Sequence, residues 1–147
     1  MHSSYPSLAV NLLVSAVIMY FVMFAMIDGP GDFRHNLNMG YMALTMAAPM
    51  GVLMLALMGE MYTNARLNTA LHIVFVALFI AAFAATRLQT FIGDEQFLRS
   101  MIPHHSGAIL MCREAQLTDP EIVSLCERII ESQREEIAQM NAILERY

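Results

Sequence analysis

Three long apolar runs constrain the fold of this chain more than any other feature. They lie at about residues 8–27, 41–58 and 70–87, and the first contains no charged side chain. A helix of about 20 apolar residues crosses a hydrocarbon core of about 30 Å. The first run lacks a positively charged leader and a small-residue cleavage site, so it predicts an uncleaved helix. We therefore expect three transmembrane helices within residues 1–90, with the two termini on opposite sides of the lipid membrane.

Charge separates this apolar region from a polar segment that follows it. Of the eight basic and thirteen acidic side chains, six precede residue 90 and fifteen lie beyond residue 93. The pattern predicts a second domain at residues 94–147. The net charge of −5 and the lack of a basic stripe argue against a nucleic-acid partner. The arginines that flank the runs favour a cytoplasmic C-terminal domain by the positive-inside rule.

Methionines recur at steps of three or four residues through the second run. The chain has fourteen, and this series is Met39, Met42, Met46, Met50, Met54, Met58 and Met61. Residues at these spacings share one face of a helix. Methionine is a flexible filler between packed helices, and the series taken alone favours that role. The alternative is a thioether surface for Cu(I) or Ag(I), because soft sulfur selects soft ions.

Residues 94–146 have the pattern of two amphipathic helices joined by a short turn. Pro103 either kinks the first helix or begins a new one. The turn "LTDPE" offers Thr118 or Asp119 as a cap and Pro120 at the first helical position. A short turn makes the two helices antiparallel neighbours. Positions at equal distances from the turn should face each other: Cys112 and Cys126, His104 or His105 and Gln133, Met101 and Glu136, and Phe97 and Met140.

This register stacks the unusual side chains in two layers. Cys112 and Cys126 form one layer, as small buried hydrophobes, as a disulfide or as metal ligands. The methionines and histidines form the other, about two turns or 10 Å away from Cys112. Consecutive histidines on a helix point about 100° apart, so both join one site only if the backbone is distorted. Otherwise His104 and His105 face different neighbours.

The polar segment also resembles a known family. The stretches "FLRSMIPHHSGAILM", "DPEI" and "SQREEI" resemble the domain of unknown function 305, over about residues 94–146. The three-helix region before them resembles the membrane-anchored bacterial branch of that family. The resemblance implies a ferritin-like helical bundle and periplasmic copper binding through Met and His. The matching positions are Met101, His104, His105, Met111 and Met140, with Gln133 and Glu136 on the second helix. Cys112 and Cys126 are not part of the family's pattern.

We therefore expect an all-α membrane protein whose C-terminal hairpin binds copper, as Cu(I), in sensing, buffering or handover. The expected metal ligands are Met101, His104, His105, Met111, Cys112, Cys126 and Met140. A hairpin of about 50 residues buries little core, so self-association into a bundle is expected, along with a metal-handling protein partner. The resemblance places the hairpin on the periplasmic side of a bacterial inner membrane, against the arginine count. The alternative is a structural or assembly subunit of a membrane complex.

No enzyme is expected from the sequence. Di-iron bundles use inward glutamates with Glu-x-x-His pairs, and neither His104 nor His105 has a glutamate three positions before it. The chain also lacks a recognisable phosphate loop and a nucleophile paired with a base.

Overall fold

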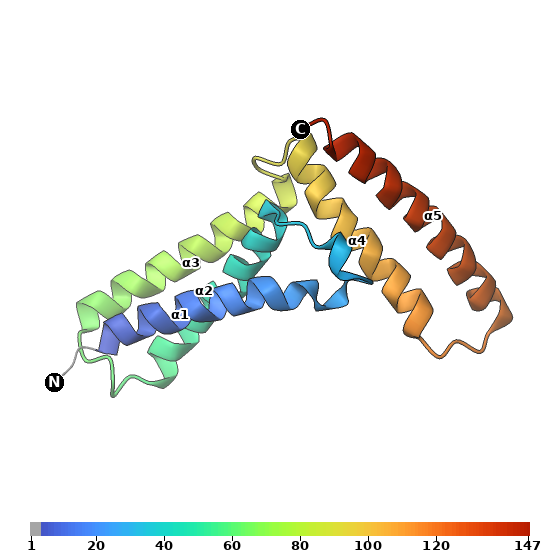
Figure 1. The fold of residues 1–147 in the computed structure, drawn as a ribbon. Helices are drawn as coiled ribbons and strands as arrows, with labels where there is room; N and C mark the ends of the chain where they lie inside the picture. Colours follow the sequence, from blue (N-terminus) through green and yellow to red (C-terminus); the bar gives the residue numbers. More distant parts are fainter. Residues whose placement is uncertain (1–3) are drawn as a thin grey trace. The chain divides into compact units, whose positions relative to one another are not determined.

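The structure, a computed structural model, describes residues 4–147, and all the regular secondary structure in them is helical (Figure 1). The long helices are α1 (Ser4–Val22), α2 (Leu37–Leu57), α3 (Ala65–Leu88), α4 (Asp94–Glu114) and α5 (Pro120–Leu144). Two 3₁₀ turns, η1 (Met23–Met26) and η2 (Pro30–Asp32), lie between α1 and α2. The all-α prediction and the two helices of the hairpin are confirmed. The described part of the chain forms two compact units.

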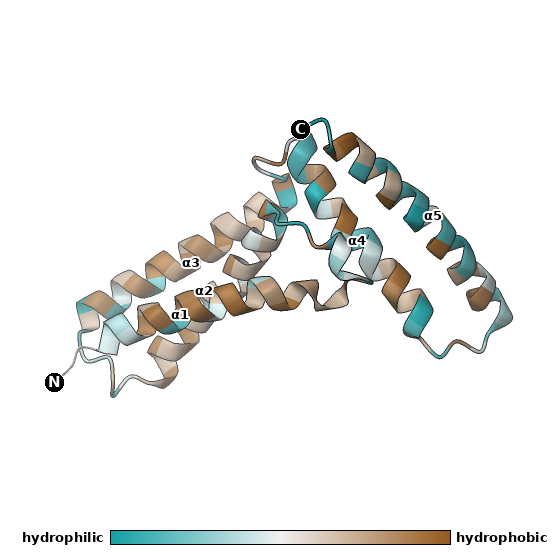
Figure 2. Ribbon diagram, in the orientation of Figure 1, coloured by the Kyte–Doolittle hydropathy of each residue, from teal (hydrophilic) through white to brown (hydrophobic). Residues whose placement is uncertain are grey.

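Residues 4–22 and 38–90 form the first unit, here called the three-helix unit. Three helical segments are long and apolar enough to cross a membrane: Ser4–Met26, Leu37–Leu57 and Ala65–Leu88. Figure 2 shows the apolar colouring that dominates these helices. The three segments agree in number and approximate position with the three predicted runs.

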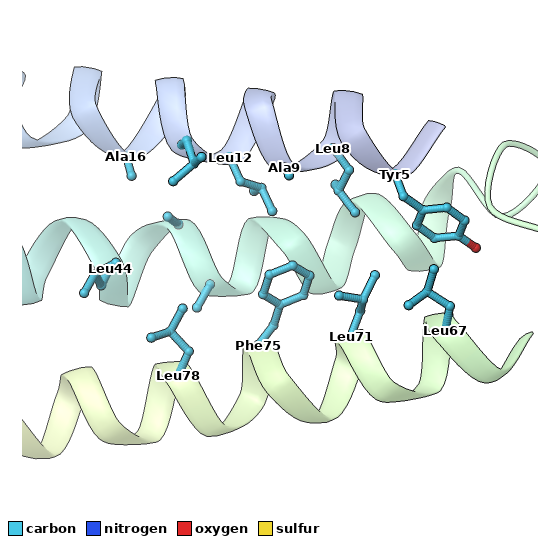
Figure 3. Close-up of a pocket in the computed structure, with 13 residues that line it drawn as sticks. Tyr5, Leu8, Ala9, Leu12, Ala16, Leu44, Leu67, Leu71, Phe75 and Leu78 are labelled. Carbon is cyan, nitrogen blue, oxygen red and sulfur yellow. The ribbon is translucent and has the colours of Figure 1, made fainter. Parts of the chain in front are cut away.

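The core of the three-helix unit lies where α1, α2 and α3 pack together. Its buried members are Leu8, Leu12, Leu55 and Tyr62, and Phe75 of α3 packs against them. A Cβ at Gly51 would lie 2.7 Å from the Phe75 ring, so the missing side chain lets the ring approach α2. An apolar cavity of about 410 Å³ lies between the same helices (Figure 3). α2 continues through Pro49.

The methionine series of the second run does not form one shared contact surface. Met50 and Met54 pack against the core of the three-helix unit. Met42, Met46, Met58 and Met61 are exposed on that unit. The packing of Met50 and Met54 agrees with a role for methionine as a flexible filler between helices.

Residues 23–37 and 91–147 form the second unit, here called the hairpin unit. α4 and α5 pack on each other around the buried side chains Leu98, Ile102, Ile109, Ile137 and Met140. α4 continues through Pro103, so the proline neither ends the helix nor starts a new one. α5 begins at Pro120, where the Asp119 side chain accepts from the backbone N–H of Glu121 and Ile122. Asp119 rather than Thr118 is therefore the cap.

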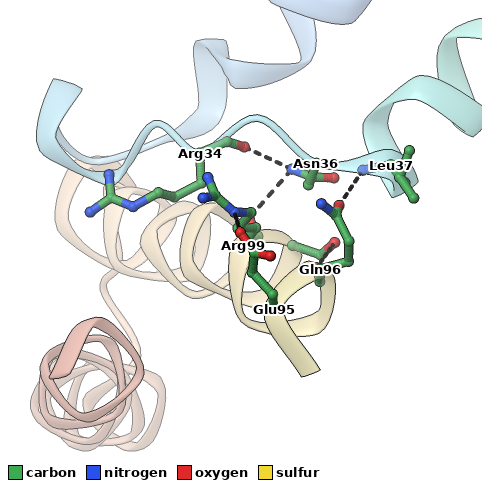
Figure 4. Close-up of polar contacts among 7 residues, drawn as sticks. Arg34, Asn36, Leu37, Glu95, Gln96 and Arg99 are labelled. Atoms are coloured by element: carbon green, nitrogen blue, oxygen red, sulfur yellow. Dashed lines mark hydrogen bonds and ion pairs between the residues drawn. The ribbon is translucent and has the colours of Figure 1, made fainter. Parts of the chain in front are cut away.

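The hairpin unit includes the segment 23–37, which runs from the end of the first span to the start of α2. Asn36 donates to the backbone carbonyl of Arg34 at 2.9 Å and to that of Arg99 at 3.4 Å (Figure 4). The backbone N–H of Leu37 donates to the Gln96 side chain at 2.9 Å. These contacts join the segment to the first half of α4.

Candidate functional site

His105 connects the two helices of the hairpin. Its Nδ1 lies 2.8 Å from the backbone carbonyl oxygen of Met101, one turn earlier on α4. Its Nε2 lies 2.7 Å from Oε2 of Glu136 on α5. The His105 side chain is 12% exposed and that of Glu136 is 46% exposed. The pair therefore lies at the edge of the helix interface, within reach of solvent.

The two partners of His105 restrict its protonation. A backbone carbonyl only accepts hydrogen bonds, so Nδ1 carries a hydrogen that it donates to Met101. An ionised Glu136 also only accepts, so Nε2 donates to it when the ring is an imidazolium. A neutral ring has a single N–H and can donate to only one of these two partners. A metal ion at Nε2 would take the place of the proton there, and the Glu136 carboxylate would have to move from its 2.7 Å contact to admit the ion.

Glu136 is positioned by its own helix. Ser132 donates to Oε1 at 3.1 Å, and Gln133 donates to Oε2 at 3.4 Å. The sequence placed Gln133 opposite the histidines and Glu136 opposite Met101. The structure instead pairs His105 with Glu136, about one turn further along α5, so that expected register is wrong at this layer.

Two of the predicted methionine ligands lie beside this pair. Met101 is one turn before His105 on α4, and Met140 is one turn after Glu136 on α5. Met140 is buried, 9% exposed, and Met101 packs against the same hydrophobic cluster. His105, Glu136 and the two methionines thus occupy adjacent turns of one helix interface.

His104 and Met111 are not brought into this group of side chains. His104 is exposed, and its ring centroid lies 5.9 Å from that of His105 with the planes 65° apart. Met111 is 54% exposed near the end of α4. The continuous helix through Pro103 keeps the consecutive histidines on different faces, as the geometry of an undistorted helix requires.

Cys112 and Cys126 form a disulfide, with Cα atoms 5.2 Å apart. The expectation that they face each other is confirmed. A disulfide sulfur is not a thiolate, which is the form of cysteine that binds metals. Across residues 4–147 no group of three or more His, Cys, Asp and Glu side chains is arranged to hold a metal ion. A metal at His105 and Glu136 would therefore need the thioethers or water to complete its coordination.

Comparison with known proteins places the chain in a family. The model of the domain of unknown function DUF305 matches residues 45–144. The chain belongs to this family. Uncharacterized protein L153 of Acanthamoeba polyphaga mimivirus is 39% identical over 117 residues, which cover 78% of this chain and 75% of that protein. No solved structure matches the chain.

The DUF305 match includes a buried serine whose role no sequence pattern indicated. Ser106 is fully buried directly after the two histidines. It accepts from the backbone N–H of Asp28 at 2.7 Å and donates to Oδ2 of Asp32 at 2.6 Å. A Cβ on the next residue, Gly107, would lie 3.3 Å from the backbone oxygen of Met26. The Ser-Gly pair therefore lets the segment 23–37 lie close against α4.

Two arginines extend this attachment to the last turn of α4 and to α5. Arg113 forms an ion pair with Asp28 at 2.6 Å, and Arg34 donates to the side chain of Asn141 at 2.8 Å. The hydrogen bond with Glu114, and then the charge of Asp28, raise the pKa of Arg113 above its usual value, so its charge is constant. One sequence feature could have indicated this attachment. The "DGPGD" stretch carries two aspartates, which need hydrogen-bond or ion-pair partners elsewhere in the chain.

Proposed function

We propose that this DUF305 protein is a membrane-anchored copper-binding protein whose site is centred on His105 of the hairpin. The observation that carries the proposal is the pair of contacts of the imidazole. Metal-binding histidines usually donate their second ring N–H to a carbonyl or carboxylate, which fixes the ring orientation. His105 has this arrangement toward Met101, and its Nε2 faces Glu136.

The available donors favour copper over hard cations. Imidazole and thioether suit Cu(I), whereas Mg²⁺ and Ca²⁺ prefer several oxygen ligands. The group offers one imidazole, one carboxylate and the thioethers of Met101 and Met140. The proposed role is sensing, buffering or handover to a metal-handling partner, because a site at the edge of the hairpin is accessible from solvent.

The adjacent histidines provide the test and its matched control. The full chain in detergent micelles, with its disulfide intact, is titrated with Cu(I) against a chromophoric chelator. We expect His105→Ala to lower Cu(I) affinity at least tenfold and His104→Ala to leave it within threefold. Equal affinities in the parent and His105→Ala would overturn the proposed site.

The burial of Met101 and Met140 favours a second candidate, a purely structural role in a membrane complex. In that role the methionines fill the helix interface, and His105 and Glu136 only link the helices. Met101→Leu combined with Met140→Leu keeps the apolar volume but removes both sulfur atoms. Loss of Cu(I) affinity with unchanged stability supports the copper site, and unchanged affinity supports packing.

For localisation we propose the bacterial inner membrane, with the hairpin unit on the periplasmic side. Disulfides persist in oxidising compartments, which supports this side over the cytoplasm. With three spans, the segment between α1 and α2 and the region after α3 lie on the same side of a membrane. The contacts of Asp28, Asp32 and Asn36, which lie between the first two spans, with α4 agree with that topology. Modification of Ser124→Cys by an impermeant maleimide in intact cells would test it, and labelling only after lysis would overturn it.

We also propose that the hairpin associates with a second copy to form a four-helix bundle. A two-helix module buries little apolar surface by itself. Met111, Ile122 and Leu125 remain exposed on the hairpin unit. Crosslinking of the full chain in native membranes should give a dimer, and a monomer alone would oppose the proposal.

A further inference from the structure

The cysteine pair lies outside the His105 group and at the turn end of the hairpin. Cys112 is near the end of α4, and Cys126 is in the second turn of α5. Both are half-buried. A hollow of about 200 Å³ lies beside them, lined in part by Leu117, Val123 and Glu127. The sulfur atoms therefore lie next to open space rather than within a closed core.

The disulfide is the main link between the helices at this end. The buried core of the hairpin consists of Leu98, Ile102, Ile109, Ile137 and Met140. Between residues 110 and 136, all of which the structure describes, no side chain is buried. Reduction of the disulfide would thus leave two facing thiols on helix ends with little other packing to hold them.

We propose that Cys112 and Cys126, when reduced, form a two-thiolate site for a soft monovalent ion, Cu(I) or Ag(I). A thiol reductant supplies two electrons and two protons, is itself oxidised to a disulfide, and converts the S–S bond into two thiols. One Cu(I) then binds both sulfurs and releases the two thiol protons to solvent. The metal takes over the connection between α4 and α5 that the covalent bond provides in the oxidised protein.

The helix positions fit this exchange. Two metal–sulfur bonds of about 2.3 Å hold the sulfur atoms no more than about 4.6 Å apart. Side chains on Cα atoms 5.2 Å apart reach this separation by side-chain rotation, and the adjacent hollow provides space for the ion. Thiolates select soft ions, so hard cations should not compete.

This site is separate from the proposed His105 site. Cys112 is about two helical turns from His105, a rise of about 10 Å, so one ion cannot contact both. The cysteine site needs the reduced protein, whereas the His105 site is tested with the disulfide intact. Failure of one proposal is therefore distinguishable from failure of the other.

The experiment counts Cu(I) ions bound by the full chain in detergent before and after reduction. The oxidised and the anaerobically reduced protein, freed of reductant, are titrated against a chromophoric chelator. We expect the reduced parent to bind one more equivalent than the oxidised parent. The same extra equivalent should appear in His105→Ala and be absent from the Cys112→Ser, Cys126→Ser double variant. Equal stoichiometry in both redox states, or an extra equivalent in the double variant, would overturn the proposal.

A second measurement needs no variant. In the reduced parent, one equivalent of Ag(I) should slow alkylation of both cysteines by N-ethylmaleimide at least tenfold. It should also restore amide exchange protection at residues 112–126 toward that of the oxidised protein. Unchanged alkylation with Ag(I) present would overturn the site, whether or not the double variant folds.

Discussion

Ser106 donates its hydroxyl hydrogen to Asp32 at 2.6 Å, across 74 positions of the chain. The same oxygen accepts from the backbone N–H of Asp28. One fully buried hydroxyl thus joins α4 to the segment that precedes α2. The Ser-Gly pair after the two histidines thus attaches this segment to α4.

We predict that Ser106→Ala destabilises the hairpin unit by about 1–3 kcal/mol. The substitution leaves the Asp28 N–H and the Asp32 carboxylate without a buried partner, and an unsatisfied buried group costs about that much. Hydrogen exchange of residues 23–37 and 94–114 in the full chain measures the loss. Ser124→Ala is the matched control, because Ser124 is exposed and accepts only from Arg128. Equal exchange rates in the two variants would contradict this role of Ser106.

A second prediction compares two glycines of α2. Gly51→Ala places a Cβ 2.7 Å from the Phe75 ring, so the ring must move. Overpacking of this kind costs about 1–3 kcal/mol. Gly40→Ala meets nothing within 4 Å and should stabilise α2 by up to about 1 kcal/mol. Thermal unfolding in detergent measures the effect, and we expect the unfolding temperature to fall in the order Gly40→Ala, parent, Gly51→Ala. Phe75→Leu should relieve the cost of Gly51→Ala, and an additive double variant would refute the contact.

The sequence predicted features that depend on local pattern. The three apolar runs predicted the three long apolar helices, since length and hydropathy are local properties. The turn signals around Asp119 and Pro120 predicted the hairpin. Cys112 and Cys126 were expected to face each other because they lie at matched distances from the turn, and the structure confirms it. Both are close to the turn, where an error in the assumed register is small.

Features that depend on distant contacts were not predictable in the same way. At His105 the expected pairing of α4 with α5 differs from the observed one by about one helical turn. The sequence predicted Gln133 as the neighbour of His105, and the structure has Glu136 there. The attachment of residues 23–37 depends on Ser106 and Asp32, which share no sequence pattern. The expected metal ligands remain a prediction. The structure places Met101, His105 and Met140 on adjacent turns of the α4–α5 interface and joins Cys112 and Cys126 in a disulfide.

A third prediction concerns the stability that the disulfide provides. Closing a loop of about 15 residues stabilises a protein by about 3 kcal/mol in the chain-entropy account. Reduction of the parent, or replacement of both Cys112 and Cys126 by serine, should lower the unfolding free energy of the hairpin unit by that order. Added reductant should have no effect on the serine variant, which is the control for reductant acting elsewhere. An unchanged unfolding transition on reduction would contradict the prediction.

The last prediction tests whether Glu136 contributes to copper binding, with the neighbouring Glu135 as the control. If copper replaces the proton at Nε2 of His105, the carboxylate that lies 2.7 Å from that nitrogen becomes a ligand for the ion. Loss of a ligand that contributes about 1.4 kcal/mol of binding free energy lowers the affinity about tenfold. Glu136→Gln should therefore weaken Cu(I) binding at neutral pH by that factor. Glu135→Gln, which changes the charge equally at an exposed position, should leave affinity nearly unchanged.

The pH dependence adds a readout that helix packing alone would not produce. Copper and the proton compete for the same nitrogen, so Cu(I) affinity in the parent should fall as the pH is lowered. His105→Ala should flatten that dependence, because thioethers do not titrate, while Glu135→Gln should keep the parent's profile. An identical pH profile in the parent and His105→Ala would assign His105 and Glu136 to the helix interface alone.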